Sequence, residues 1–348
     1  MTDSAELTFS QVFAELSSKR TLSPERVQQV FAGIFEGRWT ATQIAGFLVA
    51  LRLVGESAEM IAAAASAMRQ AMVRVEHSFP LVLDTCGTGG DHSRTLNLST
   101  GAALIAASAG IPVAKHGNRA ATSQAGSADV LEALGIPLDL AATAQKHVLK
   151  RAKIAFLFAV AHHPSMRHAM PVRRELGIRT LFNCLGPLAN PAGATHQLLG
   201  AFDHNMRPVL AGALNALGAR RAWVVRSVDE MDEISPYAPT RVTSLDNGHI
   251  EEFEIAPEDF GIPRSAPGAA DGSDPAANAR VLEAVLSGES HPSTDAFVLN
   301  AAAALVVAEG LSPRSAADKA RELVASGAAL RTLNTFREAA LAARTEAS

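Results

Sequence analysis

The spacing of apolar positions along the chain changes near residue 80. Before that point apolar residues recur three and four positions apart, as in Ile44 and Phe47, which is the period of an amphipathic helix. Thr40 and Gln43 form a capping box immediately before that run, and a capping box marks the start of a helix. We therefore predict that residues 1–75 contain helices only.

Beyond residue 80, short apolar runs of strand length alternate with helical segments. The predicted strands span residues 81–86, 111–116, 154–161, 197–202 and 222–227. The predicted helices span residues 99–109, 127–135 and 205–217. Two runs of alternating polarity flank Asn247-Gly248, a dipeptide typical of tight hairpins, so this part of the chain is predicted to be antiparallel.

Strand–helix–strand alternation favours a mostly parallel sheet with helices on both faces. The 348 residues suffice for one small and one large domain. We predict an α/β fold: a small all-helical domain over residues 1–75, and a larger α/β domain with a mostly parallel central sheet over residues 76–348.

Composition narrows the classes of partner. The net charge is −4 and aromatic residues make up 5% of the chain, which argues against nucleic-acid binding. Cys86 and Cys184 are the only cysteines, which fits a reducing compartment. The longest uncharged stretch, residues 96–114, contains Gly110 and Pro112 and is therefore not typical of a membrane span. We expect a cytoplasmic protein with neither nucleic-acid nor membrane partners.

The stretch DTCGTGGDHSRTLNLSTGAAL, residues 84–104, packs several glycines between a predicted strand and a predicted helix. Its spacing does not fit G-x-G-x-x-G, because counting from Gly87 places His92 at the last position. It also lacks the lysine of a P-loop. Two interpretations remain, a structural turn or an anion cradle made of backbone N–H groups and a helix N-terminus.

A second polar stretch, AKHGNRAATSQAGSAD (residues 114–129), favours the anion cradle. Lys115, His116, Asn118 and Arg119 follow one another at the carboxyl end of a predicted strand, where α/β sheets bind ligands. A solvated charged loop is the alternative interpretation.

Six motifs in one order are similar to those of a known family. They are GTGGD, N-x-S-T, KHGNRA, GSADVLEALG, HHPSMRHAMPVRRELGIRTLFNCLGPLANP and DEISPYAPTRV. Together they resemble the anthranilate phosphoribosyltransferase family, and the resemblance extends over nearly the whole chain. The resemblance implies transfer of the phosphoribosyl group of phosphoribosyl pyrophosphate to the amine of anthranilate, with release of pyrophosphate, in tryptophan biosynthesis.

The resemblance also implies an architecture. It places a small helical domain beside a larger α/β domain, as in the pyrimidine nucleoside phosphorylases, with the site in the cleft and residues 170–190 returning to the small domain. The pyrimidine nucleoside phosphorylases themselves are a rival interpretation, but their STGGVGD-like loop and extra C-terminal domain do not occur here. A nucleic-acid-binding paralogue is a second rival, which the charge and the intact motifs oppose.

The site residues are carried over from the motifs. For phosphoribosyl pyrophosphate they are Gly87, Thr88, Gly89, Gly90, Asp91, Thr95, Asn97, Ser99, Thr100, Lys115, His116, Gly117, Asn118 and Ser127. For anthranilate they are Gly87, His116, Asn118, His163 and Arg173. For Mg²⁺ they are Ser99, Asp232 and Glu233, whose oxygens suit a hard cation.

No residue is assigned as a general acid or base, because an aniline-type amine is already unprotonated at neutral pH. Arg174 is expected to be structural, and Asp229 and Glu230 are expected to be surface charges. His92 stands where the family usually has glycine, so this loop is expected to be stiffer or to gain a phosphate contact from Arg94.

Met60, Ala64, Met68 and Met72 form a stripe at helical spacing, typical of a core or of a helix–helix interface. With the other apolar faces it exceeds what one small domain can bury alone. Since the N-terminal helices form the dimer interface in the family, we expect a homodimer.

Overall fold

The N-terminal helices begin at residues whose side chains cap them. The computed structural model describes residues 7–89, 95–120 and 124–345. Its first four helices are α1 (Phe9–Ser17), α2 (Pro24–Phe35), α3 (Ala41–Val54) and α4 (Ala58–Ala71). Ser23 caps α2 ahead of a proline, Thr40 and Gln43 cap α3 reciprocally, and Ser57 caps α4. The helical prediction for this part of the chain is confirmed.

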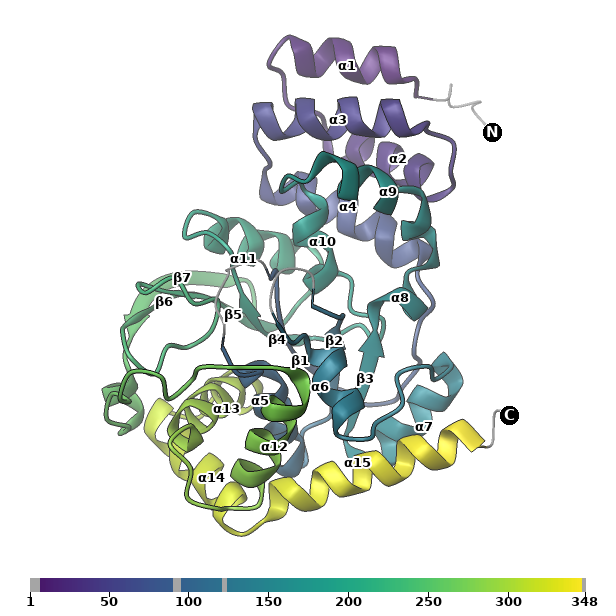
Figure 1. Ribbon diagram of the computed structural model, residues 1–348. Helices are drawn as coiled ribbons and strands as arrows, with labels where there is room; N and C mark the ends of the chain where they lie inside the picture. The colour runs from purple at the N-terminus through teal and green to yellow at the C-terminus, as the bar shows by residue number, and fades with distance from the viewer. Residues whose placement is uncertain (1–6, 90–94, 121–123, 346–348) are drawn as a thin grey trace.

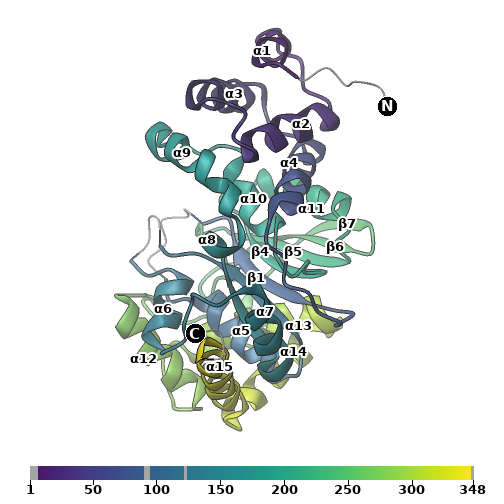
Figure 2. The same ribbon diagram turned by 90° about the vertical axis from the view of Figure 1, so that its right-hand side faces the viewer.

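A later segment of the chain packs into this bundle. After residue 158 the chain forms α8 (Ala159–His162), the 3₁₀ helix η1 (Pro164–His168), α9 (Met170–Leu176) and α10 (Phe182–Leu188). Phe182 of α10 packs edge-on against Phe31 of α2, with ring centroids 5.2 Å apart. Figures 1 and 2 show α9 and α10 beside α3 and α4, above the sheet.

The described part of the chain contains one seven-stranded sheet, ordered β3-β2-β1-β4-β5-β6-β7. The strands are β1 (Leu83–Gly87), β2 (Val113–Gly117), β3 (Ile154–Phe158), β4 (His196–Gly200), β5 (Arg221–Ser227), β6 (Thr240–Asp246) and β7 (His249–Ile255). The first five are parallel, and β5, β6 and β7 pair antiparallel. The predicted mostly parallel sheet is confirmed.

The predicted hairpin is also confirmed. It joins β6 to β7 through Asn247 and Gly248, whose φ angles of 46° and 92° are both positive. Two-residue turns with positive φ at both positions match the twist of the strands they join, and asparagine and glycine adopt that conformation at low cost.

One predicted strand ends early. The apolar run over residues 154–161 is a strand only as far as Phe158, and α8 begins at Ala159. β3 lies at the edge of the sheet, and its pairing with β2 ends at Phe158 opposite Gly117. Beyond that pair no strand remains to accept its hydrogen bonds, so the chain turns into a helix.

Helices cover both faces of the sheet. On one face, α5 (Leu98–Ser108) and α13 (Thr294–Glu309) pack against each other and the parallel strands, while α11 (Met206–Ala216) and α4 cover the other. The remaining elements are α6 (Ser127–Ala133), α7 (Ala142–Ala152), η2 (Pro257–Phe260), α12 (Pro275–Leu286), α14 (Pro313–Ala325) and α15 (Ala328–Thr345). The strand faces alternate accordingly: Val225 belongs to the first core and Val224 to the second.

The methionine stripe lies in the interior of the protein. Met60, Ala64 and Met68 are buried against α2, α10 and α11, so this stripe belongs to the core of the single chain.

In the described residues no single helix is both long and apolar enough to cross a bilayer, and only the pair α13–α14, bent by 117°, meets that test when joined.

Candidate functional site

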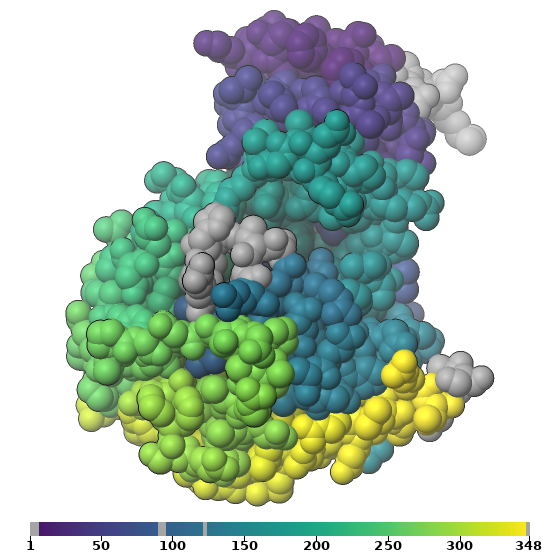
Figure 3. All heavy atoms as spheres, in the orientation of Figure 1, coloured from purple at the N-terminus to yellow at the C-terminus, as the bar shows by residue number. Residues whose placement is uncertain are grey.

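A cavity of about 910 Å³ lies between the helical bundle and the carboxyl ends of the parallel strands. Figure 3 shows this face of the molecule recessed beneath the α9 region. The predicted site residues that line it are Gly87, Thr88, Gly89, Thr95, Asn97, Ser99, Lys115, His116, Gly117, Asn118, Ser127, His163, Arg173, Asp232 and Glu233. Of the other predicted residues, Gly90 and Asp91 lie outside the described residues, as do His92 and Arg94.

Thr100 is the exception among the described residues. Its side chain is 1% exposed within α5 and does not line the cavity. Thr100 follows Ser99 by one position, and successive residues of a helix point in directions about 100° apart. The motif that supplies Ser99 to the cavity therefore turns Thr100 into the core.

The glycines of the turn have different structural reasons. Gly87 ends β1, and a Cβ atom there would lie 2.6 Å from Oδ2 of Asp232, so a side chain would displace that carboxylate. Gly89 has a φ of +68°, which glycine adopts without strain. The backbone freedom of this stretch thus serves two purposes, a close approach of Asp232 and a left-handed turn.

Lys115 and His116 belong to β2 and are buried, which agrees with the strand predicted over residues 111–116. Lys115 Nζ donates to the backbone oxygen of Thr85 at 2.5 Å and to Ser99 Oγ at 3.2 Å. Burial lowers the pKa of Lys115, and the charge of Asp84 opposes that shift. The ammonium group therefore stands at the ends of β1 and β2, beside the first turn of α5.

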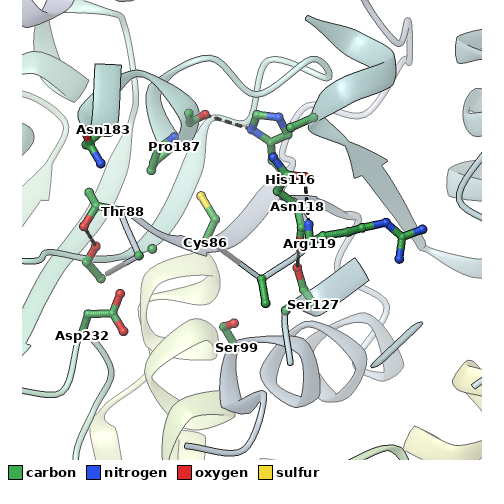
Figure 4. A pocket seen from close by; sticks show the side chains of 18 of the residues that line it. Cys86, Thr88, Ser99, His116, Asn118, Arg119, Ser127, Asn183, Pro187 and Asp232 are labelled. Carbon is green, nitrogen blue, oxygen red and sulfur yellow. Dashed lines mark hydrogen bonds between the residues drawn. The ribbon is translucent and has the colours of Figure 1, made fainter. Parts of the chain in front are cut away.

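Carboxylates from the loop after β5 reach the same place. Glu233 Oε1 accepts from the backbone N–H of Ser99 at 3.3 Å, and Glu233 Oε2 accepts from Thr95 Oγ1 at 3.4 Å. Asp232 lies against Gly87, and Figure 4 shows Asp232 and Ser99 on one side of the cavity. The structure thus brings together the three residues predicted to bind metal.

This donor set fits Mg²⁺ better than a softer metal. It consists of two carboxylates and a hydroxyl group, and in the described residues no group of three or more His, Cys, Asp or Glu side chains could hold a metal ion. Mg²⁺ is usually held by one or two carboxylates together with the phosphates of a substrate, so a sparse all-oxygen set suits it.

Sequence reasoning missed the buried carboxylate beneath this site. Asp84 Oδ1 accepts from the N–H of His116 at 3.1 Å, and its Oδ2 accepts from Asn190 Nδ2 at 2.7 Å and from Cys86 Sγ at 3.3 Å. Burial raises the pKa of Asp84, and the bond from Asn190 acts against that shift. Asp84 thereby joins β1 to β2 through the backbone of His116. A carboxylate in the middle of a predicted buried strand was the available signal.

Two histidines form a chain at the cavity wall. His116 Nδ1 lies 2.9 Å from the backbone oxygen of Gly186, so we assign a proton to that nitrogen. His116 Nε2 then accepts from His163 Nε2, 3.2 Å away. Desolvation lowers the pKa of His116 to about 3 and that of His163 to about 4. Both rings are therefore neutral in the folded protein at neutral pH.

These shifts predict how stability depends on pH. Unfolded histidine titrates near 6.5, so between pH 6.5 and the folded values the unfolded chain binds more protons than the folded one. The free energy of unfolding should then fall as the pH falls through this window. We expect His116→Asn to reduce that slope by up to about 1.4 kcal/mol per pH unit.

Urea unfolding at several pH values checks this expectation, with His147→Asn as the control because His147 lies exposed on α7. If His116→Asn and His147→Asn show the same slope, His116 is not held neutral by the fold.

The opposite wall of the cavity comes from α9 and α10. The guanidinium of Arg173 stands over the ring of Phe182 at 5.3 Å, and its NH1 points to the sulfur of Met170 at 3.7 Å. Burial lowers the pKa of Arg173, and in the described part of the chain no salt bridge to a carboxylate compensates its charge. Arg174 is exposed and does not line the cavity. This wall therefore offers a cation beside apolar surface.

The loop after β2 is held together by Asp129. Asp129 Oδ2 accepts from the backbone N–H groups of Ala120 and Gly126, and Oδ1 accepts from Arg119 at 3.0 Å. Arg119 also pairs with Glu132, and Figure 4 shows its side chain extending away from Cys86. Arg119, which the sequence grouped with the polar cluster, is thus tied to α6.

The segment over residues 263–275 packs against the glycine turn. Leu96 N donates to the backbone oxygen of Ala270 at 2.8 Å, and Thr95 forms a bridge with Asp271. Ala270 N in turn donates to the hydroxyl of Tyr237 at 2.6 Å. The role of this segment as a brace for the end of the glycine turn has no local sequence signal.

Comparisons with known proteins agree with this architecture. The chain matches the glycosyl transferase family a/b domain over residues 80–330 and the glycosyl transferase family helical bundle domain over residues 10–72. It is 46% identical over 325 residues to an anthranilate phosphoribosyltransferase of Symbiobacterium thermophilum, an alignment that covers 93% of this chain and 95% of the relative.

Solved structures are similar as well. An anthranilate phosphoribosyltransferase from Thermus thermophilus matches with a TM-score of 0.89 and 39% identity, covering 94% of this chain and 99% of the other. An anthranilate phosphoribosyltransferase from Saccharomyces cerevisiae in complex with PRPP and Mg matches with a TM-score of 0.89 and 29% identity, covering 97% and 99%.

Proposed function

The chain belongs to the anthranilate phosphoribosyltransferase family, and from this premise we propose that it transfers the 5-phosphoribosyl group of phosphoribosyl pyrophosphate to the amine of anthranilate. One observation carries the proposal. A single cavity has a lysine and two carboxylates at the strand ends and an arginine beside aromatic surface on the opposite wall. Those walls suit a diphosphate with its metal and an aromatic carboxylate, respectively.

The diphosphate is assigned to the strand-end wall. Lys115 presents a compact cation that binds phosphate as a point charge. Gly87, Thr88 and Gly89 at the end of β1 are assigned to the same substrate; in the structure the N–H of Thr88 donates to the backbone oxygen of Gly200, and that of Ser99 donates to Glu233. The other residues assigned to this substrate are Gly90, Asp91, Thr95, Asn97, Ser99, His116, Gly117, Asn118 and Ser127.

Ser99, Asp232 and Glu233 are the residues that would hold Mg²⁺. The cation supplies neutralisation of the charge that builds up on the departing pyrophosphate. Asp232 lies against Gly87, and Glu233 accepts a hydrogen bond from the N–H of Ser99 in the first turn of α5.

Anthranilate is assigned to the α9 wall. Arg173 would receive the carboxylate with the planar fork of its guanidinium, and Phe182 keeps that fork oriented by stacking beneath it. His116, His163, Asn118 and Gly87 complete this side of the cavity. The amine is unprotonated before attack, so these residues act by orienting it toward the ribose carbon, and no general base is assigned.

An assay tests the proposal directly. Purified protein with phosphoribosyl pyrophosphate, Mg²⁺ and anthranilate should consume anthranilate, followed as loss of its fluorescence, and should release pyrophosphate. Anthranilate fluorescence that stays constant at high protein concentration would reject the proposed function.

We also propose domain limits. The helical domain would comprise residues 1–75 with residues 170–190 returning to it, and the α/β domain would comprise the remainder of residues 76–348. The packing of Phe182 on Phe31 supports this division. We further propose a cytoplasmic location, supported by two buried cysteines that form no disulfide.

We propose a homodimer that forms through α1 and α3. The methionine stripe cannot supply this interface, because it is buried within the chain. A different surface can: Phe13, Val49 and Leu53 are exposed, and with Ala45, Gly46 and Ala50 they line an apolar hollow. Leu53 is 83% exposed, which is unusual for a large apolar side chain unless a partner covers it.

Substituting Leu53 tests the interface. Leu53→Asp should leave the fold unchanged, because the side chain is exposed in the single chain, and should dissociate the dimer. Burial of a leucine contributes about 1.5–3 kcal/mol. A two-fold symmetric interface buries this leucine on both subunits, so dimer affinity should fall at least about 100-fold. Light scattering measures the change, with Leu341→Asp on α15 as the matched control. A wild-type monomer at micromolar concentration, or equal masses for both variants, would refute this interface.

A further inference from the structure

The loop that carries Asp232 and Glu233 is held from inside the protein by one amide side chain. Asn300 lies on α13, is 2% exposed, and is far from this loop in the sequence. Its Oδ1 accepts from the N–H of Ile234 at 3.0 Å, and its Nδ2 donates to the backbone oxygen of the same residue at 3.0 Å. A side-chain amide thus pairs with both polar groups of one backbone residue.

The amide of Asn300 is itself fixed. Nδ2 also donates to the backbone oxygen of Ala296, one turn earlier on α13, at 3.0 Å. That bond orients the amide plane and distinguishes its oxygen from its nitrogen. Since α13 is buried along most of its length, the loop is tied to the core.

The position of the paired residue connects this contact to the cavity. Ile234 directly follows Glu233 and is fully buried, so the Asn300 pairing fixes the peptide planes on both sides of Ile234. Glu233 Oε1 accepts a hydrogen bond from the N–H of Ser99 at 3.3 Å. The backbone of Asp232 lies so close to Gly200, at the end of β4, that a Cβ atom there would collide with it. The carboxylates therefore sit in a narrow space where a small shift of the loop changes both.

A second set of hydrogen bonds, centred on Asp229, joins the two ends of this loop. Asp229 accepts from Ser235 Oγ at 2.7 Å and from Ser227 Oγ. Ser235 Oγ in turn accepts from the N–H of Tyr237 at 3.0 Å. Sequence reasoning treated Asp229 as a surface charge, and it is exposed, but its carboxylate also joins the two ends of the loop. This outer contact shapes the loop, whereas Asn300 anchors it to the core.

We propose that Asn300 is a positioning residue that sets the geometry of Asp232 and Glu233 for a divalent cation. The proposal rests on the proposed metal role of those two carboxylates. Without the amide, the N–H and carbonyl of Ile234 lose their partners in a buried place, and the loop must move to satisfy them. Groups that orient metal ligands typically change metal affinity by 10- to 100-fold when removed.

The experiment compares Asn300→Ala with Gln145→Met. Gln145 is a matched control because it is buried on α7 and donates through its amide to the backbone oxygen of Phe156 at 2.8 Å, away from the loop. Hydrogen–deuterium exchange of a peptide covering residues 228–236 is measured first, without metal or substrate. Mn²⁺ affinity is then measured by electron paramagnetic resonance with phosphoribosyl pyrophosphate present.

For Asn300→Ala we expect faster exchange in this peptide and Mn²⁺ affinity lower by about 10-fold or more. The KM for anthranilate at saturating Mg²⁺ should stay within about twofold, because Arg173 is unaffected. Gln145→Met should change neither exchange in the peptide nor Mn²⁺ affinity. If Asn300→Ala does not fold, Asn300→Leu removes the same hydrogen bonds without opening a cavity and decides the question.

The outcomes separate the two proposals. If both Asn300 variants match Gln145→Met in exchange or in Mn²⁺ affinity, Asn300 does not position the carboxylates. If the wild-type protein binds no Mn²⁺ in the presence of phosphoribosyl pyrophosphate, the metal role of Asp232 and Glu233 fails, and the positioning role fails with it. The exchange measurement would still report whether Asn300 holds the loop.

Discussion

Turnover should fall at least about 1,000-fold when Asp232 and Glu233 are both replaced by alanine. A divalent cation at the leaving pyrophosphate contributes several kcal/mol of transition-state stabilisation, and about 1.4 kcal/mol corresponds to each factor of ten. Both carboxylates line the cavity, where Asp232 lies against Gly87 and Glu233 meets the N-terminus of α5. Their loss should remove the cation while leaving the sheet intact.

The two single variants should differ. Glu233→Gln keeps one oxygen that can accept from Ser99 N–H, and its Nε2 can donate to Thr95 Oγ1, so the end of the glycine turn should keep its shape. Asp232→Asn removes the charge of the carboxylate that lies against Gly87. Mg²⁺ titrations of steady-state activity and thermal unfolding measure both effects.

Glu230→Gln is the matched control, because it removes one negative charge from the same loop at an exposed position outside the cavity lining. A double variant that turns over normally with Mg²⁺ would show that these carboxylates do not hold the metal. A double variant that loses its fold would be identified by thermal unfolding, and the two single variants would then decide the question.

Arg173→Ala should impair use of anthranilate and spare phosphoribosyl pyrophosphate. Truncating one member of a hydrogen-bonded charge pair costs about 2–5 kcal/mol, which is roughly a 30- to several-thousand-fold loss. The structure adds a reason to expect a large effect, since the guanidinium is already partly desolvated and stacked over Phe182 before any ligand binds. The guanidinium therefore has to reorganise less when the carboxylate of anthranilate binds.

Three comparisons sharpen this test. Arg173→Lys should recover only part of the loss, because an ammonium group cannot form the bidentate fork. Arg174→Ala should be mild, because Arg174 is exposed and does not line the cavity. Aniline, which lacks the carboxylate, should react slowly and to a similar extent with the wild-type protein and Arg173→Ala.

Separate titration of the two substrates distinguishes a binding role from a bracing role. If Arg173 only braces α9 against α10 through Phe182, thermal stability should fall and both substrates should suffer alike. Equal losses for anthranilate and phosphoribosyl pyrophosphate, or equal sensitivity with aniline, would exclude the carboxylate role.

Most of the fold followed from local patterns. Helix starts were predictable at Ser23, Thr40 and Ser57 because a capping side chain bonds to backbone only three residues away. The hairpin at Asn247-Gly248 was predictable for the same reason, since its geometry depends on the φ angles of two residues. Such signals lie within a few residues of the structure that they determine.

The predictions that were wrong concerned features that depend on contacts across the sheet or between layers. The strand over residues 154–161 was predicted too long, because its end depends on where β2 stops pairing with it. The methionine stripe was taken partly as an interface, and whether it is covered depends on α2, α10 and α11. Periodicity shows that a face is apolar, but it does not show which element covers that face.

The sequence by itself therefore determined the chemistry available at the site: a glycine turn, the Lys115–His116 pair, the Asp232–Glu233 pair and Arg173. Only the tertiary structure decided how these groups are held. Asn190 reaches Asp84 across 106 positions, and Asn300 reaches Ile234 across 66. Hydrogen bonds between residues so far apart leave no periodic trace in the chain, because they form only after the sheet and its helices have packed.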